Sequence, residues 1–196
     1  KSHLESCNGK LMVGHLMLFH PAITKIKSII SQGKIGKIIY MYSNRLNFGK
    51  IRKNEDVLWS FAPHDISIFQ YFINSFPISV RSEGMSYLKK NIYDTVITSL
   101  EYPSKIKAHI FNSWINPFKE HKIVIIGTKG SLCFEDSVDD KPLLFFQNKL
   151  IKKNLDLSIN NDQNKEKVSY KFTPPLENEL KYFLKILRGG PVNIAN

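Results

Sequence analysis

The clearest pattern in the sequence is a series of segments rich in β-branched and aromatic residues. The first is Lys37–Phe48. Three more follow one another in the middle of the chain, at Ile78–Tyr87, Tyr93–Tyr102 and Lys105–Trp114. Polar and apolar residues alternate through the second of these three, as expected for a strand with one buried face. The short break at Pro103-Ser104 joins two of the segments closely enough for a hairpin.

Three segments instead carry apolar residues at helical spacing. Pro21–Ser31 places its isoleucines on one face and begins with proline, which suits a first helical turn. A second helix is predicted to begin at Pro63 and to continue through an apolar face that includes Ile66 and Phe69. Pro174-Pro175 introduces the third helix, Leu176–Leu187. Its predicted buried face consists of Leu176, Leu180, Phe183, Leu184 and Leu187.

Shorter apolar segments predict the remaining strands. The polar, Asn-rich stretch Lys153–Lys167 is predicted to be a surface loop. Helices followed by a run of strands and a closing helix indicate an α+β domain, with a largely antiparallel open sheet and helices packed on one face. The glycine motif of a dinucleotide-binding fold is absent. The short strands are Lys10–His15, His121–Gly127, Ser131–Glu135, and a weaker pair, Leu143–Gln147 and Leu150–Lys152, with its turn at Asn148-Lys149.

Composition narrows the class of protein. The chain has 196 residues, 42% of them hydrophobic, enough for one domain with a core. The net charge of +11 is spread along the chain without a stripe of basic and aromatic residues, so nucleic-acid binding is not predicted. No run of about 18 apolar residues predicts a membrane span. The two cysteines, Cys7 and Cys133, are far apart, which favours a reducing, cytoplasmic setting.

His64 and Asp65 are the first candidates for chemistry, because the pattern places them in the first turn of the helix predicted to begin at Pro63. A helix N-terminus presents free N–H groups and the positive end of the helix dipole, which disfavour a charged histidine. A neutral imidazole can accept a proton from a substrate. The alternative is that both side chains only cap the helix.

The loop before this helix supplies three further candidates. Arg52 can bind a carboxylate or phosphate through two hydrogen bonds, or it can be a solvated surface charge. Trp59 can stack on a ligand or pack in the core. Asn47 places a side-chain amide at the start of the same loop. The histidines of the chain are too loosely spaced to indicate a metal, so no metal site is predicted.

Several segments, taken in order along the chain, resemble one family. The N-x-G-x-x-R loop at Asn47–Arg52 and the W-x-x-A-P-H-D motif at Trp59–Asp65 are the most distinctive. The others are Leu11–Ala22, Gly33–Ile38, Ser113–Lys119, Ile123–Leu132 and Pro174–Phe183. Together they resemble the Gfo/Idh/MocA family of NAD(P)-dependent oxidoreductases. The two distinctive motifs are most similar to the branch that oxidises nucleotide sugars, such as UDP-N-acetylglucosamine derivatives.

The resemblance implies a two-domain enzyme whose N-terminal Rossmann domain holds NAD or NADP. Residues 1–15 would be the tail end of that domain. Residues 16–196 would be the family's C-terminal α+β domain, truncated before its closing helix. The resemblance further implies that a hydroxyl of a sugar or nucleotide sugar is oxidised by hydride transfer, and that the open sheet pairs copies of the chain in a homo-oligomer.

The resemblance also assigns roles to single residues. His64 would remove the proton of the reacting hydroxyl while the adjacent C–H gives a hydride to the cofactor. His15 would lie near the cofactor at the junction of the two domains. The predicted substrate-binding residues are Asn47, Arg52, Trp59 and Asp65.

Ser60 departs from the pattern that the resemblance implies. Many members carry an aspartate four residues before the histidine, one helical turn away. Serine does not supply the negative charge that would orient and polarise His64. The alternative hypothesis is therefore a non-catalytic oligomerisation or ligand-binding remnant of such an enzyme. A nucleic-acid-binding domain has only the net charge in its favour.

Overall fold

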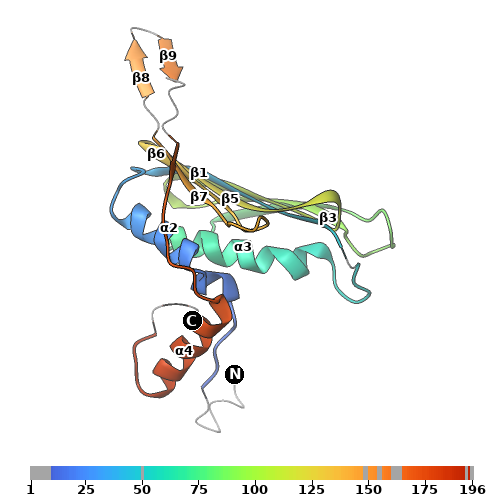
Figure 1. Cartoon of the computed structure of the whole chain (residues 1–196). Helices are drawn as coiled ribbons and strands as arrows, with labels where there is room; N and C mark the ends of the chain where they lie inside the picture. Colours follow the sequence, from blue (N-terminus) through green and yellow to red (C-terminus); the bar gives the residue numbers. More distant parts are fainter. Residues whose placement is uncertain are drawn as a thin grey trace.

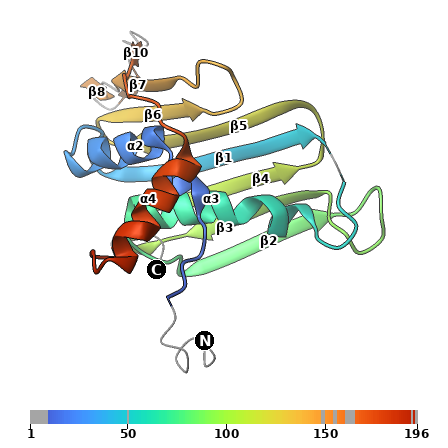
Figure 2. The same ribbon diagram turned by 60° about the horizontal axis from the view of Figure 1, so that its bottom comes forward.

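The computed structural model describes residues 10–49, 51–147, 150–153, 156–159, 165–192 and 194. Its main feature is an eight-stranded sheet, with the helices α2 (Pro21–Ser31) and α3 (Val57–Ile73) against one face (Figures 1 and 2). In the described part of the chain, no helix covers the opposite face (Figure 1). The α+β class with helices on one side of an open sheet is therefore confirmed.

The sheet is antiparallel except at one pair of strands. Its strands are β1 (Ile38–Phe48), β2 (Ser79–Met85), β3 (Thr95–Glu101), β4 (Lys107–Ser113), β5 (Ile115–Gly127), β6 (Gly130–Glu135), β7 (Leu143–Gln147) and β10 (Lys165–Lys167). They lie in the order β10-β7-β6-β5-β1-β4-β3-β2. The interior strand β1 pairs in parallel with β4 and antiparallel with β5. The predicted hairpin at Pro103-Ser104 is present, since β3 and β4 pair antiparallel across it.

The core lies between the sheet and the two helices. Ile23 and Ile26 of α2 are completely buried, as are Ile68 and Phe69 of α3. Each such side chain stabilises the fold by roughly 2 kcal/mol through removal of apolar surface from water. Helix α2 begins as predicted, with the ring of His20 accepting a hydrogen bond from Ala22 N at 3.1 Å. No described helix is long and apolar enough to cross a membrane.

Helix α3 begins earlier than the sequence indicated. Asp56 caps it by accepting a hydrogen bond from Trp59 N at 2.8 Å, and Val57 is buried in a small cluster with Trp114. Pro63 therefore lies inside the helix, and His64 is its eighth residue. The prediction that His64 occupies the first turn was wrong, so the free N–H groups of the helix end do not act on it. The alternative that His64 and Asp65 cap the helix is wrong for the same reason.

The weakest strand predictions were also corrected. Lys10–His15 forms no strand, because no strand of the described chain lies beside it to share hydrogen bonds. β7 pairs with β6 and β10, whereas β8 (Leu150–Lys153) pairs with β9 (Asp156–Ile159) in a separate two-stranded sheet. The predicted loop thus contains β9 and β10. The predicted turn at Asn148-Lys149 and the residue Cys7 lie outside the described residues.

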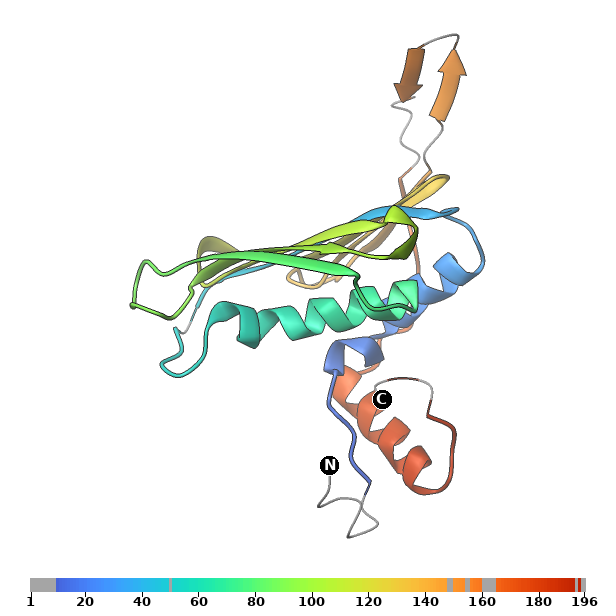
Figure 3. The same cartoon turned by 180° about the vertical axis from the view of Figure 1, so that it is seen from behind.

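The last helix, α4 (Pro175–Leu187), is present but faces the opposite way from the prediction. Its leucines at 176, 180, 184 and 187 are between 45% and 57% exposed. The helix packs on η1 (Leu16–Phe19), where Asn178 Nδ2 donates to the Phe19 carbonyl at 3.0 Å, and it extends away from the sheet (Figure 3). Amphipathic spacing identifies an apolar face, but it does not say which surface will cover that face.

Candidate functional site

A buried ion pair lies at the centre of the candidate site. Arg45 of β1 donates from Nε to Asp65 Oδ2 at 3.0 Å and from Nη2 to Asp65 Oδ1 at 3.1 Å. Asp65 is 0% exposed and Arg45 is 7% exposed. Burial alone would lower the pKa of the Arg45 guanidinium, but the Asp65 carboxylate outweighs burial and the net direction is upward. The Arg45 guanidinium therefore stays charged, and its two hydrogen bonds to Asp65 join α3 to the middle of the sheet.

Two polar residues flank Arg45 on the neighbouring strands. Asn112 of β4 and His121 of β5 both stand opposite Arg45 in the register, so their side chains lie on the same face of the sheet. Asn112 is completely buried, and neither its amide nitrogen nor its amide oxygen has a hydrogen-bond partner. The Nε2 atom of His121 is also buried without a partner. Buried polar atoms are usually paired, so this group forms an unusually polar patch beneath α3.

The Arg45–Asp65 pair also fixes the position of His64, because His64 is the neighbour of Asp65 on α3. Its Nδ1 atom is buried without a hydrogen-bond partner. Burial lowers the pKa of the His64 imidazole, and the positive charge of Arg45 lowers it further, while Asp65 acts in the opposite direction. His64 is therefore neutral at physiological pH and can accept a proton. The sequence predicted this state correctly but from the wrong cause.

A cavity of about 780 Å³ brings together two of the predicted substrate-binding residues. Asn47 and Arg52 line it, with Phe61 and Trp114. Phe61 is three residues before His64 and so lies on the same side of α3. The Arg52 guanidinium is accessible, and it pairs with Glu55 at 2.6 Å. Arg52 is thus a surface charge with a partner, placed at the edge of an open cavity.

The other two predicted substrate-binding residues lie elsewhere. Trp59 is 74% exposed and lines a separate surface depression with Asn54 and Ile92, so the alternative that it packs in the core is wrong. Asp65 has its partner inside the protein, in Arg45, and is not at the surface. Only Asn47 and Arg52 therefore share a cavity among the four.

Ser60 is next to a carboxylate of this chain. Its hydroxyl donates to Glu55 Oε1 at 3.4 Å, and the same oxygen accepts the ion pair from Arg52. Ser60 precedes His64 by one helical turn. A negative charge is therefore present near the position where the family resemblance implies an aspartate, although Arg52 neutralises part of it.

Two residues lie toward the N-terminal segment: His15, which the resemblance placed near the cofactor, and Glu179, which the sequence did not single out. His15 is the residue before η1, and the positive charge of its protonated form lowers the pKa of both His64 and Glu179. Glu179 of α4 is only 7% exposed, and its Oε1 atom has no hydrogen-bond partner. No signal in the sequence distinguished Glu179 from the other acidic residues of a surface helix. A signal did exist for Arg45, which is a charged residue within an apolar strand.

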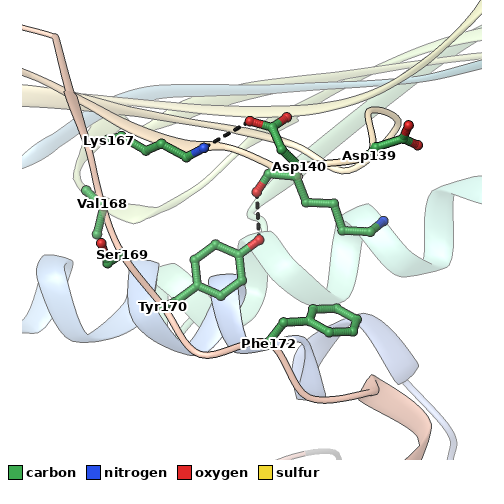
Figure 4. A pocket seen from close by; sticks show the side chains of 8 residues that line it. Asp139, Asp140, Lys167, Val168, Ser169, Tyr170 and Phe172 are labelled. Atoms are coloured by element: carbon green, nitrogen blue, oxygen red, sulfur yellow. Dashed lines mark hydrogen bonds and ion pairs between the residues drawn. The ribbon is translucent and has the colours of Figure 1, made fainter.

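A further pocket, of about 320 Å³, lies between the loop after β6 and the segment that leads to α4 (Figure 4). Two pairs of its polar groups satisfy each other. Lys167 Nζ pairs with Asp140 at 3.0 Å, and the Tyr170 hydroxyl donates to the Lys141 carbonyl at 2.6 Å. None of the predicted site residues lines this pocket, so we assign it a structural role. Among the described residues, no group of three or more His, Cys, Asp and Glu side chains is placed to hold a metal ion.

The buried histidines predict a pH-dependent stability. Burial and the charges of Arg45 and Lys119 lower the pKa of His121 to about 4, whereas its unfolded value is 6.5. Between these two values the unfolded state binds more protons, so the free energy of unfolding should fall as the pH drops through this window. His20 and His64 are shifted in the same direction and should add to the loss.

Urea unfolding at a series of pH values measures this effect. The loss of stability between pH about 6.5 and about 4 should be smaller in a His121→Gln variant, because that variant cannot take up the proton. An identical slope in the variant and in the natural protein would contradict the assignment to His121.

A comparison with protein families identifies the family to which this fold belongs. The sequence profile of the GFO/IDH/MocA C-terminal domain matches residues 23–133, more than half of the chain. An uncharacterized oxidoreductase of Streptococcus pneumoniae is 23% identical over 141 residues, covering 64% of this chain and 38% of that protein. A 2,7-anhydro-N-acetylneuraminate hydratase of Escherichia coli is 26% identical over 137 residues, covering 62% of this chain and 36% of that protein. The chain thus spans less than half the length of these two curated relatives.

Solved structures show the same fold. UDP-N-acetylglucosamine 3-dehydrogenase GnnA from Acidithiobacillus ferrooxidans superposes with a TM-score of 0.78 at 18% identity, covering 99% of this chain and 59% of that chain. An inositol dehydrogenase homolog from Azotobacter vinelandii, complexed with NADH and myo-inositol, gives 0.69 at 17% identity, covering 89% and 47%. The family profile and the shared fold together establish that the chain belongs to the Gfo/Idh/MocA family of oxidoreductases, through that family's C-terminal domain.

Proposed function

We propose that this chain is the substrate-side domain of an NAD(P)-dependent oxidoreductase that oxidises a hydroxyl of a sugar or nucleotide sugar. The observation that carries the proposal is the state of His64. Its imidazole is neutral, lies beside a buried ion pair, and follows one turn after Phe61, which lines the open cavity. His64 is not itself among the residues that line the cavity, but a neutral imidazole on the same side of α3 as Phe61 has the protonation state that a general base requires.

Each residue of the candidate site has one role in the proposed reaction. His64 accepts the proton of the reacting hydroxyl, while the hydrogen of the adjacent C–H bond leaves as a hydride. A nicotinamide cofactor, held mainly by another domain, supplies the acceptor for that hydride. The buried atoms Nδ1 of His64 and Oε1 of Glu179 have no hydrogen-bond partner, and unpaired polar atoms of this kind suit the polar groups of a bound cofactor. The Arg45–Asp65 pair fixes the turn of α3 that carries His64.

Asn47 and Arg52 are proposed to hold the substrate. They offer an amide and a guanidinium at the cavity wall, a combination that suits hydroxyls and an anionic group. Two of the similar proteins are named for nucleotide-sugar and sialic-acid chemistry, which supports a sugar bearing a negative charge. Trp59, exposed on the adjacent surface, could stack on a further ring of a long substrate.

The test is an assay of the protein translated from the complete reading frame. Its reduction of NAD⁺ and NADP⁺ is followed by nicotinamide absorbance with a panel of free sugars, sugar acids and UDP-sugars. Turnover with an anionic or nucleotide sugar is the expected result. Absence of nicotinamide reduction with every member of the panel would overturn the proposal.

A second candidate function is a non-catalytic binding or assembly module. Ser60 favours it, because its hydroxyl provides no charge of its own and depends on Glu55, which Arg52 partly neutralises. A measurement of sugar affinity distinguishes the oxidoreductase from the binding module. A binding module retains sugar affinity in the absence of any nicotinamide reduction, and that affinity is measurable by calorimetry.

The uncovered face of the sheet is proposed to pair copies of this chain. Its surface carries Ile97, which is 45% exposed, and the stacked rings of Tyr42 and His109, whose centroids are 5.3 Å apart. An apolar and aromatic surface of this kind favours association. We expect the protein to sediment as an oligomer and an Ile97→Lys variant to shift toward the monomer. A Thr24→Lys variant on the exposed side of α2 is the matched control, and equal sedimentation of the two variants would contradict this interface.

A further inference from the structure

The two edges of the eight-stranded sheet are built differently. The edge strand β10 is three residues long, and two of these residues are Lys165 and Lys167. Short edge strands and lysines are devices that keep a sheet from pairing with another chain. The opposite edge strand, β2, has seven residues without proline or lysine, and its register with β3 is continuous (Figure 2). β2 therefore lacks the protection that β10 has.

The outer side of β2 is open to solvent. All seven residues of β2 are exposed, and among the described strands only β3 pairs with it. The backbone N–H and C=O groups on that outer side can therefore bind a further strand. Val80 stands opposite the buried Leu100 in the register, so it lies on the same face of the sheet as α3. Val80 is nevertheless 59% exposed, and the edge thus leaves apolar surface in water.

Two charges on β2 specify the partner. Arg81 and Glu83 lie on the uncovered face of the sheet, and their side chains are 81% and 74% exposed. If two β2 strands pair antiparallel about a twofold axis at Ser82, Arg81 of each copy stands opposite Glu83 of the other. A register shifted by two residues would instead place Arg81 opposite Arg81, or Glu83 opposite Glu83, and like charges in these positions repel. The edge is therefore complementary to itself in one register.

The same register also covers apolar surface. It places Val80 of one copy opposite Gly84 of the other. A Cβ atom on Gly84 would come within 2.7 Å of the Tyr93 ring, so this ring occupies the space that a side chain at position 84 would need. Tyr93 is 44% exposed. Val80 of the second copy would therefore pack beside the Tyr93 ring, and both would lose contact with water.

We propose that β2 pairs antiparallel with β2 of a second copy of this chain, about a twofold axis at Ser82, and joins the two sheets into one. The helices of both copies lie on the same side of the joined sheet, because opposite residues of an antiparallel pair share a face. This edge contact is separate from the interface at Ile97 on the uncovered face. It does not depend on the proposed catalysis.

Disulfide cross-linking tests where the two copies meet. A Ser82→Cys variant, with Cys7 and Cys133 replaced by serine, should form a disulfide-linked dimer under mild oxidation, because position 82 of one copy faces position 82 of the other. Ser86→Cys in the same background is the matched control. In this register Ser86 stands opposite Ile78 of the second copy, so that variant should remain a monomer on a non-reducing gel. Equal cross-linked fractions in the two variants would overturn the proposal.

Charge reversal tests the register. In the Ser82→Cys background, Arg81→Glu should lower the initial rate of cross-linking at least about fivefold, because like charges then face each other twice. A further Glu83→Arg change should restore the rate, because the opposite charges are then exchanged. Both side chains are exposed, so neither change threatens the fold. A rate that Arg81→Glu leaves unchanged, or that the double change does not restore, would overturn the pairing.

Discussion

A His64→Gln variant of the complete protein is expected to lose at least about a hundredfold in turnover, the range that a positioned general base contributes. Glutamine fills most of the volume of the imidazole but cannot accept the hydroxyl proton. Since Nδ1 of His64 has no hydrogen-bond partner, the substitution leaves no described group newly unpaired. The fold should therefore survive, and the loss should appear in kcat with little change in KM.

Steady-state kinetics and thermal unfolding of the same variant separate chemistry from folding. Thr24→Lys is the control, because Thr24 lies on the exposed side of α2, outside both the candidate site and the proposed interface. That control should retain the turnover of the natural protein. Unchanged turnover in the His64→Gln variant would remove His64 from the mechanism and would leave the binding-module function as the better explanation.

Strands β1 to β7 and α2 could be predicted because their signals are local. The apolar run of β1 and the alternation in β3 each identify a strand without knowledge of its partners. The start of α3 could not be predicted in this way. Pro63 is a strong marker for a first turn. However, Asp56, seven residues earlier, caps the helix, and Val57, six residues earlier, makes a buried contact. These interactions outweigh the local preference.

The site was only partly visible for a similar reason. His64, Asn47 and Arg52 stand in motifs that can be found along the chain, and two of them do line a cavity. The partnership of Arg45 with Asp65 joins residues that are 20 positions apart, and it depends on how α3 packs against β1. Glu179 is more distant still, since its burial depends on how α4 meets η1.

An Asp65→Ala variant is expected to lose about 3–5 kcal/mol of unfolding free energy, because it leaves the Arg45 guanidinium buried without its counter-charge. An Arg45→Ala variant should lose a similar amount for the complementary reason. Urea unfolding measures both losses. The double variant Arg45→Met, Asp65→Leu should be much closer to the natural protein, because apolar residues of similar volume remove both buried charges at once.

The exposed ion pair of Arg52 and Glu55 provides the matched control in the same protein. Its nitrogen–oxygen distance is 2.6 Å, shorter than the 3.0 Å of the buried pair, yet the Arg52 side chain is 60% exposed. Water and salt screen such a pair, so a Glu55→Ala variant should cost no more than about 1 kcal/mol. Equal losses in the Asp65→Ala and Glu55→Ala variants would show that burial does not set the strength of the Arg45–Asp65 pair. The site would then lack the rigid support for His64 that the proposed chemistry requires.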